Sequence, residues 1–382
     1  LNGIWSQWTE QIAQSRKVSA DQLNQLANDS IMVFASVGDY KAARLIDRAF
    51  YPDEMQQVVR RKLGLGKDDE LHLLTLDNML HLKPAKKVKE KGDEIAVYYA
   101  YGEIVDELAS GFMSGHNIVG RTTADDLRRL AENEKVKAVV LRVNSGGGSA
   151  VASEQIWHAI KQLKTKKPVV VSMGGAAASG GYMISAAADY IIAEPTTITG
   201  SIGIFGLIPN FSGLVTDKLG VTFDGVKTNK FTDYEEQLVL GKENSQEMKY
   251  MQGYVDRGYI TFLDIVADGR KMKRDEVDSI AQGRVWLAKD ALKIKLVDKL
   301  GSLDDAVKKA AELAKAKEYH TAAYPAAATW FEQLMAEKKK NSYLDSELRT
   351  VLGELYEPLV QLRQDVKGSR LQARLPYRLE VK

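Results

Sequence analysis

The sequence predicts an α/β fold in which parallel strands alternate with helices, with further helical segments on either side. Short apolar runs rich in β-branched and aromatic residues recur from about residue 94 to 196, and helical segments separate them. Strands that alternate with helices indicate a parallel sheet buried between helices. With 382 residues, 45% of them hydrophobic, the chain can bury a substantial core.

The elements follow in order along the chain. Residues 1–65 are predicted to be helical, and 66–93 form a charged linker that includes "KPAKKVKEKGDE". Residues 94–315 form the central domain, of which 242–315 is mostly helical, and 316–382 are expected to be a helical extension with a solvated lysine run, "AEKKK". The expected strands of the central domain are "EIAVYYAYGEI", "VKAVVLRV", "KPVVVSM" and "DYIIAEP". The helices between them include "TTADDLRRLAENE" and "SEQIWHAIKQLKT".

Composition excludes several classes of function. A net charge of +2 with interspersed signs provides no basic stripe for nucleic acid, and acidic substrates are not indicated. The absence of cysteine excludes disulfides, thiolate catalysis and zinc–thiolate sites. It does not indicate whether the protein resides in an oxidising or a reducing compartment. No stretch of about 18 uncharged apolar residues occurs, and "LNGIWSQWTEQ" lacks the basic and apolar regions of a signal peptide.

The chain contains an internal repeat. Residues 12–27 resemble residues 266–281 at an offset of 254 (266 − 12), and 39–47 resemble 290–298 at an offset of 251 (290 − 39), with Asp53 opposite Asp304. Two matches in the same order favour a long repeat over coincidence. If the second copy holds a catalytic segment, the equivalent segment of the first copy lies upstream of Leu1, so the chain is expected to be a fragment of a tandem protein.

Two glycine-rich turns, "VNSGGGSA" and "GGAAASGGY", each end a strand and open a helix. Helix starts present free N–H groups, and glycine lets a substrate approach the backbone, so such turns suit an anion or a developing oxyanion. GxxxxGK[ST] and GxGxxG are both absent, which disfavours a nucleotide site. Acyl transfer uses both turns, because one presents the nucleophile Ser179 and the other presents backbone donors. The alternative is that Ser179 is a small residue chosen for tight packing.

The hydroxyl of Ser179 needs a base. The five histidines lie in no triad-like context; they are His72, His81, His116, His158 and His320, and His158 is expected on an exposed helix face. A neutral lysine can serve instead if burial lowers its pKa from about 10.4 toward 7, which costs roughly 4 to 5 kcal/mol. Such a lysine requires an apolar pocket.

With "NSGGGSA" before the serine turn and "ITGSIGIFG" after it, residues 94–315 resemble the signal peptide peptidase A family. These are serine proteases with a Ser-Lys dyad, and the resemblance implies the fold shared by Clp proteases and crotonases. Residues 1–65 resemble the end of the first of two tandem halves in the long bacterial form, which agrees with the repeat.

The resemblance assigns roles to individual residues. Ser179 matches the nucleophile, and Ser201, which is 22 positions later (201 − 179), matches a serine that hydrogen-bonds the lysine amine. Without the family, Ser201 is as well explained as a turn-capping serine. Gly146 stands where relatives commonly have proline, which loosens the turn. The N–H groups matched to the oxyanion donors are those of Gly147, Gly148 and Gly180.

The base has two candidate sources. In short members of the family the lysine follows the nucleophile by about fifty residues, and Lys230 lies 51 residues after Ser179 (230 − 179). In long tandem members the first half contributes the lysine, and here that segment would lie upstream of Leu1 or in a neighbouring chain. Lys227 and Lys230 are otherwise explained as surface lysines of a polar loop.

The resemblance implies an endopeptidase that cleaves apolar, membrane-derived peptides such as cleaved signal peptides and requires no metal or cofactor. It also implies a homo-oligomeric ring or bowl, anchored in the bacterial inner membrane with its catalytic part facing the periplasm. The Ser179 hydroxyl is then expected to face an open pocket ringed by amide N–H groups. One alternative is a crotonase-like acyl-CoA enzyme, for which Glu154 is the nearest carboxylate; the other is a non-catalytic half that serves assembly or substrate capture.

Overall fold

The structure, a computed structural model, describes residues 1–29, 35–66, 69, 71, 73–75, 78–79, 91–107, 116–225, 228–241, 245–325 and 371–374. The chain divides into two compact units, Leu1–Glu90 and Lys91–Lys382. The division falls inside the segment that the sequence predicts to be a charged linker. Each unit is described by itself below.

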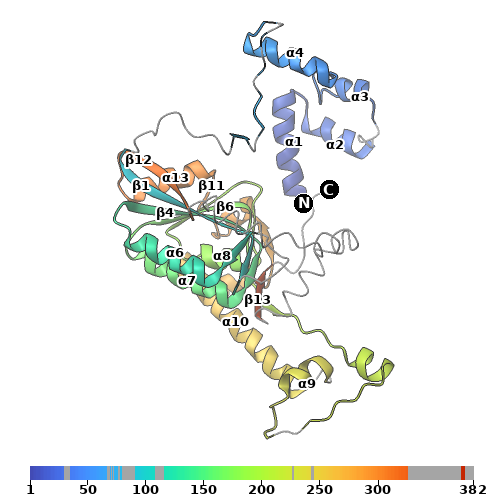
Figure 1. The fold of residues 1–382 in the computed structure, drawn as a ribbon, viewed down its shortest axis with the longest axis vertical. Coiled ribbons are helices and arrows are strands. Elements are labelled where there is room, and N and C mark those ends of the chain that lie inside the picture. Colours follow the sequence, from blue (N-terminus) through green and yellow to red (C-terminus); the bar gives the residue numbers. More distant parts are fainter. Residues whose placement is uncertain are drawn as a thin grey trace. The chain divides into compact units, whose positions relative to one another are not determined.

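The first unit is helical, as the sequence predicts (Figure 1). Its helices are α1 (Asn2–Arg16), α2 (Ala20–Asp29), α3 (Val37–Ala42) and α4 (Pro52–Leu63). Local signals explain their ends. Helix α4 begins with a proline, whose fixed φ suits the first turn, and ends at Gly64, which adopts the left-handed conformation (φ 71°, ψ 20°) that glycine allows.

The second unit contains a mainly parallel sheet with the strand order β10-β8-β6-β4-β1-β12, and β7 pairs with both β6 and β11. Only the β10–β8 pairing is antiparallel among the described pairs of this sheet. The four predicted strands all lie within this sheet, so the prediction of a parallel α/β fold is confirmed. The strands are β1 (Asp93–Tyr101), β4 (Val136–Ser145), β6 (Val169–Ala178), β7 (Tyr190–Ala193), β8 (Ile198–Gly200), β10 (Val285–Leu287), β11 (Lys299–Leu300) and β12 (Tyr319–Tyr324).

Helices cover both faces of this sheet. The middle of strand β4, residues 138–141, is apolar because alternate residues enter two different cores: Val139 and Leu141 pack with helices α6, α7 and α8, while Ala138 and Val140 pack with α13. Figure 1 shows α6 and α7 on one face of the sheet and α13 on the other. The helices span α6 (Gly120–Glu132), α7 (Ala150–Lys164), α8 (Gly180–Ser185) and α13 (Leu303–Leu313).

A second, smaller sheet has the strand order β3-β2-β5-β13-β9. It contains the last described strand of the chain, β13 (Leu371–Arg374). The other strands are β2 (Glu103–Val105), β3 (Asn117–Val119), β5 (Gly147–Ser149) and β9 (Phe205–Gly206).

The expected helical extension over 316–382 is therefore corrected for its described residues, whose regular elements are the strands β12 and β13. Strand β12 follows the edge of β1 in parallel register, Asp93 opposite Tyr319, and its residues alternate between exposed and partly buried positions. A period of two favours a strand over a helix. The lysine run "AEKKK" lies outside the described residues.

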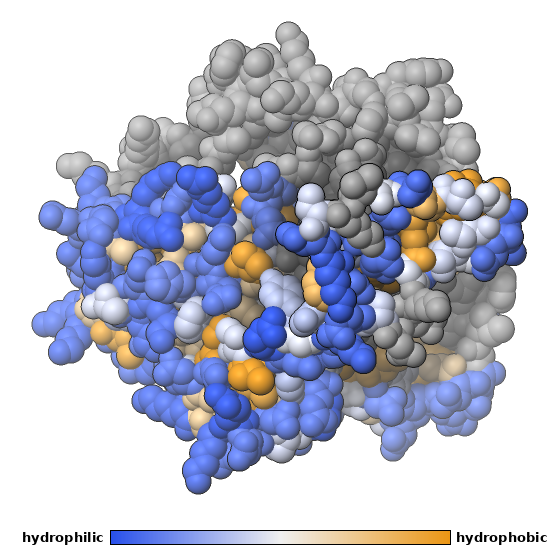
Figure 2. Space-filling model, turned by 90° about the horizontal axis from the view of Figure 1, so that it is seen from below, coloured by the Kyte–Doolittle hydropathy of each residue, from blue (hydrophilic) through white to orange (hydrophobic). Residues whose placement is uncertain are grey.

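The chain from Leu207 through α9 (Tyr234–Leu240) into the first half of α10 (Gln246–Arg270) is called the arm below. It extends away from the main sheet, with α9 at the far end of α10 (Figure 1). Only the part of α10 nearer its C-terminus reaches the core, through Phe262, Leu263, Ile265 and Val266. Exposed apolar side chains are frequent along the arm, including Leu207, Phe211, Leu214, Leu219, Phe223, Tyr250 and Tyr254. Figure 2 shows that the apolar groups on the face seen from below are separated by hydrophilic ones. Among the described residues, no helix has the length and apolar character needed to span a membrane.

The internal repeat is present in three dimensions. Helices α1 and α10 each end in an arginine followed by a left-handed lysine, Lys17 (φ 55°, ψ 45°) and Lys271 (φ 54°, ψ 44°). Arg16 donates to both carboxylate oxygens of Asp47 at 3.0 Å and to the Arg44 carbonyl. The same pattern recurs at the second copy.

Arg270 donates to both carboxylate oxygens of Asp298 at 3.0 and 2.6 Å, and to the carbonyl of Lys295 at 2.9 Å. Burial lowers the pKa of Arg270, but the hydrogen bonds to Asp298, together with the charge interactions with Tyr182 and Asp298, more than offset burial and hold this pKa above its ordinary value. The repeated segments of the sequence therefore fold into the same helical module, which ends in α4 in the first unit and α13 in the second.

The two copies of the helical module differ in how far their corresponding side chains are buried. Asp298 also accepts the N–H of Ile191 in strand β7 (2.7 Å), and its side chain is 26% exposed. The equivalent Asp47 is 85% exposed. On the last helix, Ala306 is buried against the sheet, whereas Met55 at the corresponding position (306 − 251) is 47% exposed. In the second unit the module packs against the main sheet through Asp298 and Ala306. In the first unit the corresponding residues, Asp47 and Met55, are exposed.

We expect Tyr182→Phe to reduce the free energy of unfolding by about 1–3 kcal/mol, because it leaves a buried carbonyl without its donor. Tyr182 is fully buried in α8, and its hydroxyl donates to the Leu296 carbonyl at 2.8 Å. Burial raises the pKa of Tyr182, so the hydroxyl remains a donor. Urea denaturation measures the change, and Tyr99→Phe on the exposed side of β1 is the control. Equal effects of the two substitutions would contradict the role given to this bond.

Candidate active site

Ser179 stands at a strained turn between β6 and α8. Its backbone angles, φ 52° and ψ −116°, are ones that side chains rarely adopt and cost of order 1–3 kcal/mol. Two backbone hydrogen bonds hold the turn: the Ser179 N–H donates to the Gly200 carbonyl, and the Ser179 carbonyl accepts from the Met183 N–H, both at 2.8 Å. Strain at a strand-to-helix turn is typical of nucleophile positions in hydrolases.

The hydroxyl of Ser179 does not cap the helix that follows it. Ser179 occupies the N-cap position of α8, but its side chain accepts no hydrogen bond there. Ser149, at the N-cap of α7, behaves in the usual way and accepts the N–H of Ala152 at 3.2 Å. Helix capping therefore does not explain the serine at position 179.

The neighbouring turn requires a glycine at position 181, two residues after Ser179. A Cβ atom on Gly181 would lie 2.7 Å from the carbonyl oxygen of Ser145, and Ser145 pairs with Ala177 across strands β4 and β6. Larger side chains would separate the two glycine-rich turns. Tight packing therefore explains Gly181, and the same packing brings the two predicted turns together.

Ser201 lies beside Ser179. The residues that precede the two serines, Gly200 and Ala178, are directly paired across the parallel strands β8 and β6. Both serines are buried and both have a positive φ, 52° for Ser179 and 48° for Ser201. The Ser201 N–H donates to the Arg284 carbonyl at 2.7 Å. The structure thus brings these two predicted site residues together at the end of the sheet.

Two of the other predicted donors, Gly147 and Gly148, lie in β5, and the third lies in α8. Gly147 and Gly148 have φ values of 102° and 156°, so both are in the region that favours glycine. The N–H of Gly147 donates to the Ser145 Oγ at 3.1 Å, and this donor is therefore used within its own turn. Gly148 is opposite Ile104 of β2 on one side and Ala373 of β13 on the other. Gly180 is the first residue of α8.

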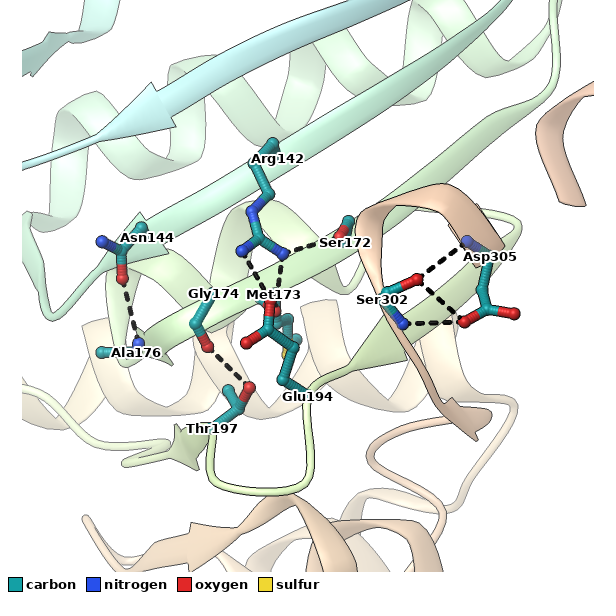
Figure 3. Close-up of polar contacts among 10 residues, drawn as sticks. All are labelled: Arg142, Asn144, Ser172, Met173, Gly174, Ala176, Glu194, Thr197, Ser302 and Asp305. Atoms are coloured by element: carbon teal, nitrogen blue, oxygen red, sulfur yellow. Dashed lines mark hydrogen bonds and ion pairs between the residues drawn. The ribbon is translucent and has the colours of Figure 1, made fainter. Parts of the chain in front are cut away.

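Polar side chains fix the end of β6 where it approaches Ser179 (Figure 3). The Asn144 Oδ1 accepts the N–H of Ala176 at 3.1 Å, and the Thr197 hydroxyl donates to the Gly174 carbonyl at 2.6 Å. Arg142 donates to Glu194 at 2.7 Å and to the Ser172 hydroxyl at 2.9 Å. The sequence analysis does not identify these supporting residues, although an arginine inside the apolar run "VVLRV" is a signal that a partner must be present.

Access to Ser179 differs from the expectation. The sequence predicts a hydroxyl that faces an open pocket, but Ser179 has 0% exposed surface, and its Oγ lies 3.5 Å from the carbonyl oxygen of Gly203. The backbone of β13 passes close to α8, the helix that begins after this serine. A substrate can therefore reach the Ser179 hydroxyl only if the residues that cover it move aside.

The structure does not bring Lys230 to Ser179. Lys230 is exposed just before α9, at the far end of α10 from α8 (Figure 1), and its Nζ lies 5.1 Å from the centre of the Phe231 ring. Lys227 lies outside the described residues. No hydrogen bond or ion pair joins Ser179 to a lysine or histidine within the part of the chain that the structure describes.

The remaining candidate side chains have other surroundings. His116 contacts the Tyr101 hydroxyl at 2.6 Å, and His158, exposed on α7 as expected, lies 3.0 Å from Gln162. His320 contacts the carbonyl of Lys91 at 3.3 Å, while His72 and His81 fall outside the described residues. Glu154 is exposed on α7, which does not favour the acyl-CoA alternative. No group of three or more potential metal ligands occurs among the described residues.

Comparison with known proteins gives the family. The sequence profile of peptidase family S49 matches residues 161–317. A putative signal peptide peptidase SppA of Enterococcus faecium is 35% identical over 242 residues, which cover 62% of this chain and 70% of that protein. The chain belongs to peptidase family S49. The profile of Clp protease matches residues 115–197 of this S49 chain, in agreement with its α/β fold of mostly parallel strands.

Longer relatives match almost the whole S49 chain. Protease 4 of Salmonella typhi is 38% identical over 387 residues, which cover 98% of this chain and 60% of that protein. Protease 4 of Haemophilus influenzae is 36% identical over 338 residues, which cover 87% of this chain and 54% of that protein. The chain therefore spans between half and two thirds of the length of these curated relatives.

We expect Gly148→Ala to destabilise this S49 chain by at least about 2 kcal/mol, because an alanine there is strained and overpacked. Its Cβ would lie 2.0 Å from the backbone oxygen of Ile104, which cannot move without breaking the β2–β5 pairing. The control is Gly175→Ala, whose Cβ makes only an ordinary contact, 3.6 Å from Asn144. Thermal unfolding of both variants measures the difference. A Gly148→Ala protein as stable as the control would show that β5 can take up another conformation.

Proposed function

We propose that this chain supplies the nucleophile and the oxyanion donors of a serine endopeptidase that cleaves apolar, membrane-derived peptides such as cleaved signal peptides. The observation that carries the proposal is the strained turn at Ser179, whose hydroxyl caps no helix and which lies in the segment matched by family S49. A relative bears the name of a putative signal peptide peptidase, which supports the proposed class of substrate.

In the proposed mechanism, a neutral lysine amine accepts the proton of Ser179 as Oγ attacks the scissile carbonyl. The tetrahedral intermediate places negative charge on the former carbonyl oxygen, where backbone N–H groups stabilise it. The candidates are the N–H groups of Gly180, at the start of α8, and of Gly147 and Gly148, in β5. The N–H of Gly147 must then exchange its bond to Ser145 for one to the oxyanion. The amine next protonates the leaving nitrogen, and water hydrolyses the acyl-enzyme.

The lysine has two proposed sources. A lysine from another part of the complete protein, or from a neighbouring chain, is favoured because Lys230 is exposed just before α9, and α9 lies at the far end of α10 from the main sheet (Figure 1). Ser201 is the proposed partner of the amine, since its backbone is paired next to that of Ser179. Lys230 remains the alternative, and it requires the arm of one chain to reach the site of another.

The repeat supports a tandem organisation for the complete protein. We propose that residues 1–65 end a first half built like the second. The exposed carboxylate of Asp47 and the exposed side chain of Met55 occupy the positions that Asp298 and Ala306 use against the sheet in the second unit. A sheet of the same kind would bury both groups.

Assembly and location are also proposed from the family. The exposed apolar side chains of the arm, among them Phe211, Phe223 and Tyr250, support contacts with further copies in a ring or bowl. The location that we propose is the bacterial inner membrane, with the catalytic part facing the periplasm.

We expect Ser179→Ala in the complete protein to lower kcat/KM for peptide hydrolysis by at least about 10³-fold, because nothing else supplies the nucleophile. Labelling by a serine-directed fluorophosphonate should disappear as well. Ser279→Ala, an exposed serine on α11 (Arg274–Ile280), is the control and should retain both signals. Hydrolysis by the Ser179→Ala protein at the normal rate would show that the nucleophile is misassigned.

We expect Lys230→Met to leave kcat/KM of the complete protein within about twofold of the unsubstituted value, because Lys230 is exposed just before α9, which lies at the far end of α10 from the main sheet (Figure 1), and loss of a general base costs about 10²–10⁴-fold. Lys218→Met, another exposed lysine of the arm, is the matched control. A loss of about 10²-fold or more in the Lys230 variant alone would assign it as the base.

A further inference from the structure

The Ser201 loop, residues 201–203, brings two groups to Ser179. Ser201 lies beside Ser179, because the residues before the two serines are paired across β8 and β6, and the carbonyl oxygen of Gly203 lies 3.5 Å from the Ser179 Oγ. The loop is tightly packed, since a Cβ atom on Gly203 would lie 2.9 Å from the Cα of Gly283. The geometry at Ser179 therefore depends on the contacts that hold this loop.

A turn between α11 and β10, residues 281–284, holds the Ser201 loop through its backbone. The Ser201 N–H donates to the Arg284 carbonyl at 2.7 Å, and the Gly283 N–H donates to the Ile202 carbonyl at 2.9 Å. Hydrogen bonds in both directions fix the position of one segment relative to the other. A shift of the turn is therefore transmitted to Ser201.

The 281–284 turn is itself strained. Gln282 has a φ of 57°, a left-handed conformation that residues other than glycine seldom adopt. Residues 282–285 are exposed, so burial of apolar side chains does not hold the turn in this conformation. Within the turn, the Arg284 guanidinium donates to the Gln282 Oε1 at 2.7 Å and to the Ser279 carbonyl. A strained backbone persists only when its surroundings fix it, so a contact from another element is needed.

Tyr259, near the middle of α10, supplies that contact. Its hydroxyl accepts the N–H of Gln282 at 3.1 Å and donates to the Asp278 Oδ1 at 2.5 Å. Burial and the hydrogen bond to Asp278 raise the pKa of Tyr259 to about 12, so the hydroxyl stays protonated and keeps its donor role. The ring packs against the main hydrophobic core, which gives the hydroxyl a fixed position.

We propose that Tyr259 is a positioning residue of the proposed peptidase site: its hydroxyl, acting through the 281–284 turn, holds Ser201 in place beside Ser179. This inference rests on the proposed function in taking Ser201 as the partner of the lysine amine. Without the hydroxyl, the N–H of Gln282 loses the partner that fixes its strained conformation, so the turn relaxes and its bonds to the Ser201 loop weaken. The hydroxyl also connects the Ser201 loop to α10, whose first half belongs to the arm.

The test compares Tyr259→Phe with Tyr254→Phe in the complete protein. Tyr259→Phe removes only the hydroxyl and keeps the ring that packs against the core. Gln282 is exposed and Asp278 is partly exposed, so water satisfies both groups and the variant is expected to fold. Tyr254 is an exposed tyrosine on the same helix, so its substitution controls for the loss of a hydroxyl from α10.

The first readout is amide hydrogen exchange, measured by mass spectrometry, and it does not depend on activity. The segment 198–204 should exchange at least about tenfold faster in Tyr259→Phe than in the unsubstituted protein, because the Ser201 N–H loses its fixed acceptor. Exchange of β4 should be unchanged, and Tyr254→Phe should match the unsubstituted protein. Unchanged exchange of 198–204, or equal acceleration throughout the main sheet, would overturn the proposal.

The second readout is labelling of Ser179 by a fluorophosphonate. The rate constant should fall at least about tenfold in Tyr259→Phe while the final extent of labelling stays complete, because a misplacement of about 1 Å can cost about 10²-fold in rate. A lower extent at an unchanged rate constant would mean that the hydroxyl only stabilises the fold, and the proposal would be wrong. If exchange changes as expected and the unsubstituted protein is not labelled, Tyr259 still positions the Ser201 loop and the proposed peptidase function fails.

A second substitution tests the route through the turn. Glycine adopts the conformation of Gln282 without strain, so Gln282→Gly removes the need for Tyr259 to hold the turn. The Tyr259→Phe/Gln282→Gly protein should therefore recover an exchange rate of 198–204 within about threefold of the unsubstituted value. Exchange as fast as in Tyr259→Phe alone would contradict the proposal.

Discussion

Strand β6 must leave the main sheet at Ser179 while its neighbours continue past it, and the candidate active site follows from this constraint. The turn needs a backbone conformation that a serine adopts only under strain, and the pairing of Ala178 with Gly200 and the N–H bond from Ser179 to Gly200 hold it there. Because α8 then starts beside the end of β4, Gly181 comes close to the Ser145 carbonyl. The nucleophile turn and the glycine turn are brought together by one change of direction.

The polar groups around this turn contribute rigidity. Asn144, Thr197 and Thr199 bind backbone groups of the last residues of β6, and each does so from a neighbouring strand or the loop leading into it. Buried backbone groups that lack partners are costly, so these side chains complete the pairing where the ladder between β4 and β6 becomes irregular. A strained turn persists only when its surroundings are fixed in this way.

The repeated helical module has a different relation to the sheet in each unit. In the second unit Arg270 and Asp298 connect the end of α10 to strand β7, and α13 covers one face of the sheet. In the first unit Arg16 and Asp47 make the same ion pair, so the module does not need the sheet to form it. The local geometry is specified by the segment itself, and the packing against a sheet is an additional, separable interaction.

The sequence by itself determined the local structure. The alternation of apolar runs with amphipathic segments predicted the parallel sheet, the matched segments predicted the repeat, and the glycine-rich turns predicted which strand ends approach each other, because these signals depend on side chains close together in the chain. It did not show that residues 371–374 lie beside Gly148, nor that Ser179 is buried, nor that Lys230 is far from it. These are contacts between residues far apart in sequence, and only the tertiary structure decides them, since a strand such as β13 takes its position from a gap that other strands leave.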